Sequence, residues 1–354
     1  MKRKIFFILS SLSAGGAERV FWLLSQGFDK KMYDVSIVLL NPNKKCFSNE
    51  LEGVTIIDLG TTKASLSFFK LRKLLRRERP DTVFSTVDHI NILVALVSFF
   101  VSVPNLIARA SNIPSQIRKY RGSKARFYNF FTRFCYARFD KVVCQSEEME
   151  QSVRTEFRVR SNKLVVIPNP VIFTDIKGIG NLKATAKKLI LVARLSPEKG
   201  ISRLLHILHS LPDHYSLTIV GDGALRSDTE ERLRSLNLQN RVRLLGQQSN
   251  VVGLIAQHDL LVLSSFTEGF PNVVLEALSV GIPVVAFKVG GISRIIRDDF
   301  NGFMLEQDDV QGFKNAIVAA CSKKWDATAI KNDVFEQCAL DKITDRYESL
   351  MTHN

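Results

Sequence analysis

The chain of 354 residues exceeds one ordinary domain of roughly 100–200 residues and suits two. Its content of 45% hydrophobic and 24% charged residues excludes a wholly disordered or fibrous protein. Five cysteines, an odd number without metal-ligand spacing, argue against a disulfide framework and a zinc module, and they indicate a reducing compartment.

The net charge of +14 lies in the first half of the chain. Residues 1–170 hold 28 Lys and Arg against 14 Asp and Glu, whereas residues 171–354 hold 21 of each. This asymmetry predicts an anionic partner for the first half, such as a phosphorylated substrate, a nucleic acid or an acidic membrane face. A basic surface that serves only solubility is the alternative.

The amino-terminal apolar run admits two interpretations. Residues 1–17 have the basic start, short apolar stretch and small residues of a secretory signal. The same letters predict a buried strand, Ile5–Leu9, that runs into a glycine loop. We favour the strand because the apolar run is short and the loop opens directly into an amphipathic helix, Glu18–Gly27.

Short apolar runs then alternate with helical segments. The long helix Leu66–Arg79 stops at Pro80, and the apolar stretch Ile90–Ala108 is interrupted by Pro104. The continuous part of that stretch, about 14 residues, falls short of the about 20 that span a bilayer, so we predict a buried helix, a strand and no transmembrane helix. The other strands of the first half are predicted at Asp34–Leu40, Thr55–Asp58, Thr82–Thr86, Asn105–Ala108 and Lys141–Cys144.

Pro168-Asn169-Pro170 ends the first run of alternation, and Thr174–Lys188 has the glycines of a linker. The pattern resumes with strands at Leu189–Ala193, Ser216–Val220, Val242–Leu245, Leu260–Leu263, Val284–Phe287 and Gly302–Leu305. Near-continuous apolar strands separated by helices indicate parallel sheets covered on both faces. We therefore predict two doubly wound α/β domains, 1–172 and 173–339, with a ligand cleft between them.

Two charged segments follow predicted strands of the second half. Arg194 and Lys199, five residues apart, can hold a pyrophosphate, and solvated surface charge is the alternative. Glu276 lies inside an apolar helical stretch, where a carboxylate needs a partner such as a sugar hydroxyl or a salt bridge. It follows Glu268 by eight residues, or about 12 Å along a helix. Because glycosidase carboxyls lie only about 5–9.5 Å apart, this spacing favours two contacts to one long ligand.

Glycine loops also follow predicted strands. Gly15-Gly16, Gly221-Asp222-Gly223 and Gly290-Gly291 each allow backbone N–H groups to approach a nucleotide or phosphate closely. Each is also a common turn sequence. Their shared position after strands is a stronger signal than any single motif.

Taken together, these residues resemble glycosyltransferase family 4, whose members are retaining, nucleotide-sugar-dependent enzymes with the GT-B fold. The resemblance covers nearly the whole chain in the right order. It rests on Gly-Gly-Ala-Glu at 15–18, the loop Arg194…Lys199-Gly200, Gly221-Asp222-Gly223 and the Glu268-x7-Glu276 segment.

The resemblance implies a role for each matching residue. Arg194 and Lys199 would bind the donor diphosphate and stabilise the leaving group without a metal or other cofactor, and Glu268 would hold the hydroxyls of the transferred sugar. Glu276 would hold the ribose. The predicted donor contacts are Gly15, Gly16, Gly221, Gly223, Gly269, Phe270, Pro271, Asn272 and Glu276. The final helix, about 340–354, would pack back on the first domain, which would bind the acceptor.

One region departs from the family pattern, and a second contains residues whose match to that pattern is not fixed. Gly290-Gly291-Ile292-Ser293-Arg294 has a base where many members have Glu. Asp88 and His89 lie near the place where relatives often have an acceptor-side histidine, and we place Arg109 with them. A satisfied, buried histidine is the alternative for His89.

The stretch 109–141 interleaves nine Lys and Arg with aromatic residues. This composition suits an anionic membrane face, single-stranded nucleic acid or partial burial as ordinary core. We interpret the protein as a cytoplasmic glycosyltransferase, peripheral on the inner face of the membrane, that uses a nucleotide sugar, with UDP-sugar favoured, and a glycan acceptor linked to polyprenyl diphosphate. We expect no nucleic-acid partner. A nucleotide-sugar epimerase or a basic nucleic-acid-binding protein are the alternatives.

Overall fold

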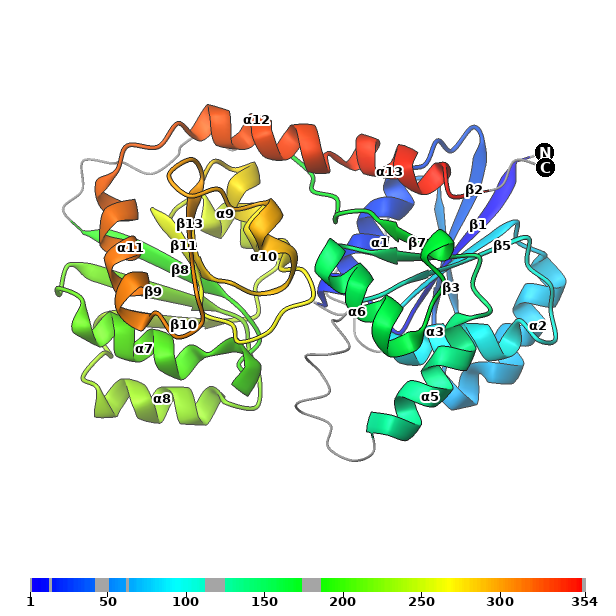
Figure 1. Cartoon of the computed structure of the whole chain (residues 1–354), viewed down its shortest axis with the longest axis horizontal. Coiled ribbons are helices and arrows are strands. Elements are labelled where there is room, and N and C mark those ends of the chain that lie inside the picture. Colours follow the sequence, from blue (N-terminus) through cyan, green and yellow to red (C-terminus); the bar gives the residue numbers. More distant parts are fainter. Residues whose placement is uncertain are drawn as a thin grey trace. The chain divides into compact units, whose positions relative to one another are not determined.

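The computed structural model describes residues 2–12, 15–41, 51–61, 64–111, 125–173 and 186–351 (Figure 1). The chain divides into two compact units, residues 1–170 with 338–354, and residues 171–337. Each unit is a parallel sheet with helices on both faces, so the predicted fold class of two doubly wound α/β domains is confirmed. The division between the units falls within two residues of the boundary predicted from the sequence.

The first unit contains a seven-stranded sheet in the order β3-β2-β1-β4-β5-β6-β7, with every neighbouring pair parallel. Its strands are β1 (Arg3–Leu9), β2 (Tyr33–Leu39), β3 (Val54–Asp58), β4 (Thr82–Thr86), β5 (Asn105–Arg109), β6 (Lys141–Cys144) and β7 (Leu164–Val166). Its helices are α1 (Gly16–Gly27), α2 (Phe68–Glu78), α3 (Asp88–Val97), α5 (Ala125–Tyr136), α6 (Glu147–Phe157) and α13 (Leu340–Glu348), with the short 3₁₀ helices η1 (Ala64–Ser67) and η3 (Ser161–Lys163).

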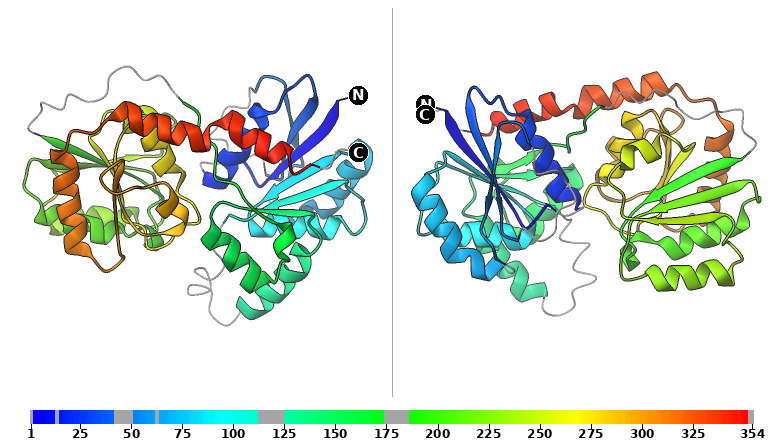
Figure 2. Two further views of the ribbon diagram at one scale, coloured as in Figure 1. Left: turned by 45° about the horizontal axis from the view of Figure 1, so that its top comes forward. Right: turned by 180° about the vertical axis from the view of Figure 1, so that it is seen from behind.

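Different helices cover the two faces of this sheet (Figure 2), and each face carries its own apolar core. Helices α2, α3, α5 and α6 cover one face, where they meet Phe6 and Ile8 of β1. Helices α1 and α13 cover the other face, where they meet Ile5 and Phe7 of the same strand. Because successive side chains of a strand point to opposite faces, a strand with two covered faces must be apolar at nearly every position. This is why β1 is a continuous apolar run, and it excludes the signal-peptide interpretation of these residues within this fold.

The second unit contains a six-stranded parallel sheet in the order β10-β9-β8-β11-β12-β13. Its strands are β8 (Lys187–Val192), β9 (Tyr215–Val220), β10 (Val242–Gly246), β11 (Leu260–Leu263), β12 (Val284–Phe287) and β13 (Gly302–Leu305). Its helices are α7 (Ile201–Ser210), α8 (Arg226–Ser235), α9 (Val251–Ile255), α10 (Asn272–Ser279), α11 (Val310–Ser322) and α12 (Ala327–Cys338), with the 3₁₀ helices η4 (Pro197–Lys199) and η5 (Gly290–Arg294).

The structure differs from the sequence predictions in a few places. Lys187 and Lys188 begin β8, although the sequence placed both in the linker, of which residues 174–185 lie outside the described part. The predicted helix Leu66–Arg79 begins instead at Phe68, after η1. The basic aromatic stretch is described only in part, because residues 112–124 and the side chains of 125–130 lie outside the description. Within the described ranges, no helix is both long and apolar enough to cross a bilayer.

Candidate functional site

The order of strands in the second unit creates one topological switch point. The chain proceeds from β8 outward to β9 and β10, and then returns to β11 on the opposite side of β8. The loops that follow β8 and β11 therefore diverge from one point of the carboxyl edge, which is where open α/β sheets bind their ligands. The first of these loops contains Arg194 and Lys199, and the second contains Glu268.

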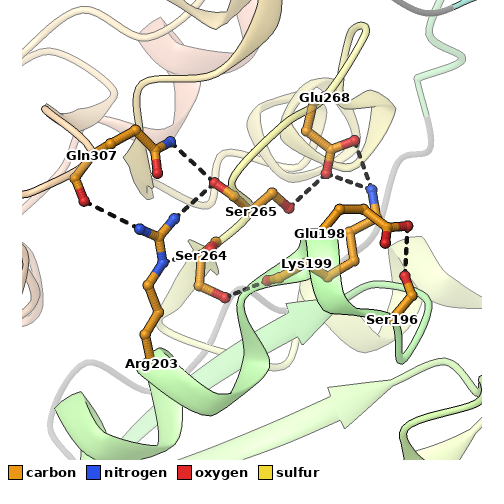
Figure 3. A network of polar contacts seen from close by, with 8 residues as sticks. All are labelled: Ser196, Glu198, Lys199, Arg203, Ser264, Ser265, Glu268 and Gln307. Carbon is orange, nitrogen blue, oxygen red and sulfur yellow. Dashed lines mark hydrogen bonds and ion pairs between the residues drawn. The ribbon is translucent and has the colours of Figure 1, made fainter. Parts of the chain in front are cut away.

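An ion pair joins the two loops at this switch point (Figure 3). The Lys199 Nζ donates to Glu268 Oε1 at 2.7 Å and to Oε2 at 2.8 Å. The Ser265 Oγ donates to the same Oε1 at 2.7 Å. Both charged side chains are largely buried, with 18% and 14% of their surface exposed. The sequence predicted separate ligand contacts for these residues, whereas the structure brings them together so that the carboxylate fixes the ammonium in place.

The backbones of the two loops are also joined directly. The Ser264 Oγ donates to the Lys199 carbonyl at 2.9 Å, and the Phe266 N–H donates to the Glu198 carbonyl at 2.7 Å. Gly200 has a φ of 63°, and a Cβ there would collide with the Ser264 carbonyl oxygen. Only glycine adopts this conformation without strain while leaving room for the neighbouring loop. The sequence motif Lys199-Gly200 thus serves loop packing as well as charge.

Arg203, which no sequence motif indicated, binds three backbone carbonyls around the site (Figure 3). Its guanidinium donates to Ser264 O and Ser265 O at 2.8 Å each and to Gln307 O at 3.2 Å. It also lies 4.0 and 3.8 Å from the ring centres of Phe266 and Phe287. Burial lowers the pKa of Arg203 to about 10, so the side chain stays charged near neutral pH. Arg203 holds the loop that carries Ser265 and Glu268.

We expect the substitution Arg203→Lys to destabilise the second unit by roughly 2–3 kcal/mol and to weaken nucleotide binding about tenfold. An ammonium cannot reproduce the planar fork or satisfy three carbonyls, and hydrogen bonds from a charged group contribute about 1.5–3 kcal/mol each. Thermal unfolding and calorimetric titration with UDP measure the two effects.

A second arginine supplies the matched control for this substitution. Arg241 also donates to carbonyls, those of Tyr215, Leu208, Leu211 and Pro212, but it precedes β10 and so lies at the opposite edge of the sheet. Arg241→Lys should lower stability and leave nucleotide affinity unchanged. Equal losses of affinity in both variants would mean that Arg203 acts only through stability.

Arg194 and Glu198 occupy the loop between β8 and α7. Arg194 is exposed, and within the described residues its guanidinium has neither a hydrogen-bond nor an ion-pair partner. Glu198 accepts a hydrogen bond from the Ser196 Oγ at 2.6 Å. The pKa of Glu198 is lowered overall. Burial raises it, but the bond from Ser196, a bond from its own backbone N–H and the charges of Lys199 and Arg194 together lower it by more. Arg194 is therefore available to an anion, whereas Lys199 already has a partner.

The segment from Glu268 to Glu276 leads from the loop into α10. Gly269, Phe270 and Asn272 are partly exposed and Pro271 is buried as the residue before the helix. Glu276 is 7% exposed, in the second turn of α10. Gly290, with a φ of 49°, packs against this segment, since a Cβ there would lie 2.7 Å from the carbonyl oxygens of Glu268 and Gly269. The donor roles predicted for these residues stay predictions.

Gly221 and Gly223 belong to the loop after β9. The Gly221 N–H donates to the Gly246 carbonyl at 2.8 Å. Between the loops, the Leu195 N–H donates to the Asp222 carbonyl at 3.1 Å, and Leu225 donates back to Leu195 at 3.0 Å. This loop is thereby attached to the one that carries Arg194. The four loops after β9, β8, β11 and β12 form a continuous row along one edge of the sheet.

In the first unit, Gly15 and Gly16 begin α1 after β1. The Glu18 carboxylate lies over Gly15, where a Cβ would collide with it, and it accepts from the Ser10 Oγ at 3.2 Å. A glutamate at this third helical position compensates the N–H groups of a helix start. The negative charge at this helix start is supplied by Glu18 of the chain itself, and the donor contacts predicted for Gly15 and Gly16 stay predictions.

Asp88 and His89 begin α3 directly after a strained residue. Val87 has a φ of 69°, in a region that branched side chains avoid at a cost of about 1–3 kcal/mol. His89 is exposed, so its interpretation as a satisfied buried histidine is wrong. Asp88 accepts from the Tyr136 hydroxyl at 3.4 Å. Strain of this kind is typical of functional loops, and the acceptor-side roles of Asp88 and His89 stay predictions.

Arg109 ends β5 as a buried cation with 3% exposure. It donates to Asn169 Oδ1 at 2.6 Å and to Thr86 Oγ1 at 3.3 Å, while its Nε has no partner among the described groups. Burial lowers the pKa of Arg109, and the neighbouring Tyr347 and Glu18 raise it. Gln145, after the adjacent β6, is 2% exposed, and both of its side-chain polar atoms are likewise unpaired. The sequence offered no signal for Gln145.

Comparisons with known proteins agree with this geometry. Residues 14–173 match the family described as Glycosyltransferase Family 4, and residues 173–334 match Glycosyl transferases group 1. The chain is 27% identical, over 75% of its length and 73% of the relative's, to the UDP-Gal:alpha-D-GlcNAc-diphosphoundecaprenol alpha-1,3-galactosyltransferase of Escherichia coli. It is also 27% identical, over 86% and 85% of the two chains, to the GalNAc-alpha-(1->4)-GalNAc-alpha-(1->3)-diNAcBac-PP-undecaprenol alpha-1,4-N-acetyl-D-galactosaminyltransferase of Campylobacter jejuni.

Among solved structures, Anabaena Alr3699/HepE in complex with UDP-glucose has the same fold. The TM-score is 0.82 at 21% identity, and the alignment covers 98% of this chain and 99% of that one. The two matched families meet at residue 173, close to the division between the two units, and together they extend from residue 14 to residue 334. The chain therefore belongs to the family 4 glycosyltransferases of the GT-B fold.

Proposed function

We propose that this glycosyltransferase moves a hexose or N-acetylhexosamine from a UDP-sugar to a glycan carried on a polyprenyl diphosphate, with retention of anomeric configuration and without a metal ion. The transfer takes place at the cytoplasmic face of the membrane and contributes to surface polysaccharide or lipopolysaccharide synthesis. The single observation that carries the donor half of this proposal is the paired Lys199 at the switch point of the second unit, beside the exposed Arg194.

The chemistry of the leaving group supports the roles of these two cations. Breaking the bond between sugar and diphosphate develops negative charge on the diphosphate oxygens, and fixed positive groups stabilise that charge most when they need no rearrangement. Glu268 and Ser265 hold Lys199, and Arg203 holds the loop of Glu268. The ammonium is thus positioned before the donor arrives, and Arg194 adds a fork that matches a phosphate.

The relatives support the choice of donor and acceptor. The Escherichia coli relative is named for a UDP-Gal donor and a diphosphoundecaprenol acceptor, and the Campylobacter jejuni relative for a PP-undecaprenol acceptor. The Anabaena structure contains UDP-glucose. For this chain, the basic first unit suits an acceptor with a diphosphate group at an anionic surface.

Nucleotide release from a panel of UDP- and GDP-sugars, with and without a bacterial lipid extract, tests this proposal. We expect release from one UDP-sugar, dependent on the extract and unchanged by EDTA. Release without the extract would indicate hydrolysis or epimerisation. A requirement for a divalent cation would contradict the metal-independent mechanism. Failure of every donor to bind would contradict the proposal as a whole.

A further inference from the structure

A cavity of about 450 Å³ lies in the first unit, and its lining includes none of the candidate site residues discussed above for that unit. Its wall consists of the end of α5 and the segment that runs from the end of α6 to η3. These segments lead into the starts of β6 and β7, so the cavity lies at the edge where these strands begin. The loops of Gly15, Asp88 and Gln145 follow strands and therefore lie at the opposite edge.

The cavity is lined by four cationic side chains, those of Arg133, Arg158, Arg160 and Lys163, and none of its described lining residues is acidic. The Lys163 Nζ is held by the carbonyls of Ala137 at 2.9 Å and Phe139 at 2.7 Å. The three arginines have neither hydrogen-bond nor ion-pair partners for their guanidinium groups within the described residues, and all three are exposed. Four like charges repel one another unless an anion neutralises them, and guanidinium forks match phosphate oxygens.

Arg158 ends α6 with a φ of 50°, a left-handed conformation that usually selects glycine or asparagine at this position. Arg79 ends α2 in the same way, with a φ of 46°. Glycine is therefore compatible with the backbone at both positions, which makes the two arginines a matched pair for substitution.

Exposed aromatic rings adjoin the cavity. Phe134 lines it, is 56% exposed and stacks on Phe99 with the ring centres 5.6 Å apart. Phe99 and Phe100 are 47% and 59% exposed, and the Arg138 guanidinium lies 4.8 Å from the centre of the Phe99 ring. Aromatic rings beside cations are the composition that settles at the boundary between headgroups and acyl chains of an anionic membrane.

We propose that this cavity binds the headgroup phosphate of an anionic membrane phospholipid, while Phe99, Phe100 and Phe134 enter the interface beside it. This inference rests on the proposed function in so far as that function places the enzyme at a membrane. It assigns the membrane contact to this one cavity at the end of α6, instead of to the whole basic stretch 109–141.

The substitution Arg158→Gly tests the inference with little risk to the fold, because glycine relieves the left-handed conformation while removing the charge. Arg79→Gly is a matched control: Arg79 ends α2 with a φ of 46°, in the same unit, and does not line the cavity. Sedimentation with phosphatidylcholine vesicles, with and without phosphatidylglycerol, measures membrane affinity. Thermal unfolding checks that both variants fold.

We expect Arg158→Gly to bind phosphatidylglycerol vesicles about fivefold more weakly, and Arg158→Gly combined with Arg160→Gln about 25-fold more weakly, from the usual contribution of one cation near an anionic surface. Arg79→Gly should stay within about twofold of the wild type. Equal loss in Arg79→Gly would mean that net charge, and not the cavity, governs binding.

Two competition experiments distinguish the sources of phosphate. Millimolar inorganic phosphate should leave vesicle binding unchanged, and displacement by it would reassign the cavity to a free anion. Displacement by single-stranded RNA that depends on Arg158 would likewise overturn the lipid assignment. Calorimetric titration with UDP separates this inference from the proposed function. If the Arg158 variants bind both UDP and vesicles as the wild type does, the lipid role of the cavity is refuted and the proposed function is not. If the wild type does not bind UDP, the proposed donor is refuted and the lipid role of the cavity is not.

Discussion

The substitution Lys199→Gln is expected to slow sugar transfer at saturating donor by about 10²–10³-fold. The ammonium is held at the switch point by two bonds to Glu268, and the proposed function places the leaving diphosphate at this ammonium. Removal of one preorganised group of this kind from an active site costs about 2.7–4 kcal/mol of transition-state stabilisation. Single-turnover measurements with saturating donor and lipid-linked acceptor report this step without interference from binding.

A double substitution separates catalysis from stability at this pair. Lys199→Gln alone leaves the Glu268 carboxylate, 14% exposed, with the Ser265 hydroxyl but without its counter-charge, so this variant should also unfold at a lower temperature. Adding Glu268→Gln removes the uncompensated charge and should restore much of the stability but none of the rate. If the double variant regained the transfer rate as well as the stability, Lys199 would contribute to transfer only by stabilising the fold.

The control for Lys199 is an ion pair of the same length elsewhere in the second unit. Lys323 Nζ lies 2.7 Å from Asp299 Oδ1, but the carboxylate is 76% exposed. Exposed pairs contribute about 0–1 kcal/mol. Lys323→Gln should therefore change neither transfer rate nor donor affinity measurably.

The substitution Glu276→Gln is expected to weaken UDP binding about 10–100-fold. Glu276 is 7% exposed among apolar residues of α10, where a carboxylate is costly without hydrogen bonds, and the proposed function assigns it the donor ribose as a partner. Hydrogen bonds to a charged group contribute about 1.5–3 kcal/mol. Glu231→Gln on the exposed side of α8 supplies a control with the same change of charge.

A change in the ligand tests the same contact from the other side. If Glu276 accepts from a ribose hydroxyl, 2′-deoxy-UDP should bind the wild type more weakly than UDP, while the Glu276→Gln variant should distinguish the two nucleotides much less. The coupling between the two changes measures the contact itself. Equal discrimination by both proteins would remove the ribose role, whatever the loss of affinity in the variant.

The sequence predicted the sheets because each central strand has both faces covered and is therefore a nearly unbroken apolar run. The same reasoning failed for β7, where Leu164–Val166 is only three residues long and partly exposed. It placed Lys199 and Glu268 correctly in loops after strands, since that depends on local pattern. It could not show that they pair, because 69 residues separate them and the strand order alone brings them together.

Arg203 shows what a sequence pattern cannot reveal about the site. On an amphipathic helix such as α7, an arginine beside apolar residues is typical of a solvent-facing position. Its carbonyl partners lie 61, 62 and 104 residues further along the chain. Only the folded sheet places them around one guanidinium. The same holds for Arg158, because a conformation with positive φ at a helix end leaves no mark in the sequence when the residue is not glycine.

The return of α13 to the first unit determines which of the two units can complete its folding first during synthesis on the ribosome. Ile343, Tyr347 and Met351 complete the core beneath α1, and Arg346 donates to the Val166 carbonyl at 2.6 Å. The first unit therefore emerges first but lacks part of its core until the last helix has been synthesised. The second unit is one continuous stretch, 171–337, and can fold while the first still waits. During synthesis, the amino-terminal half is thus the part that exposes apolar surface longest and most needs protection by chaperones.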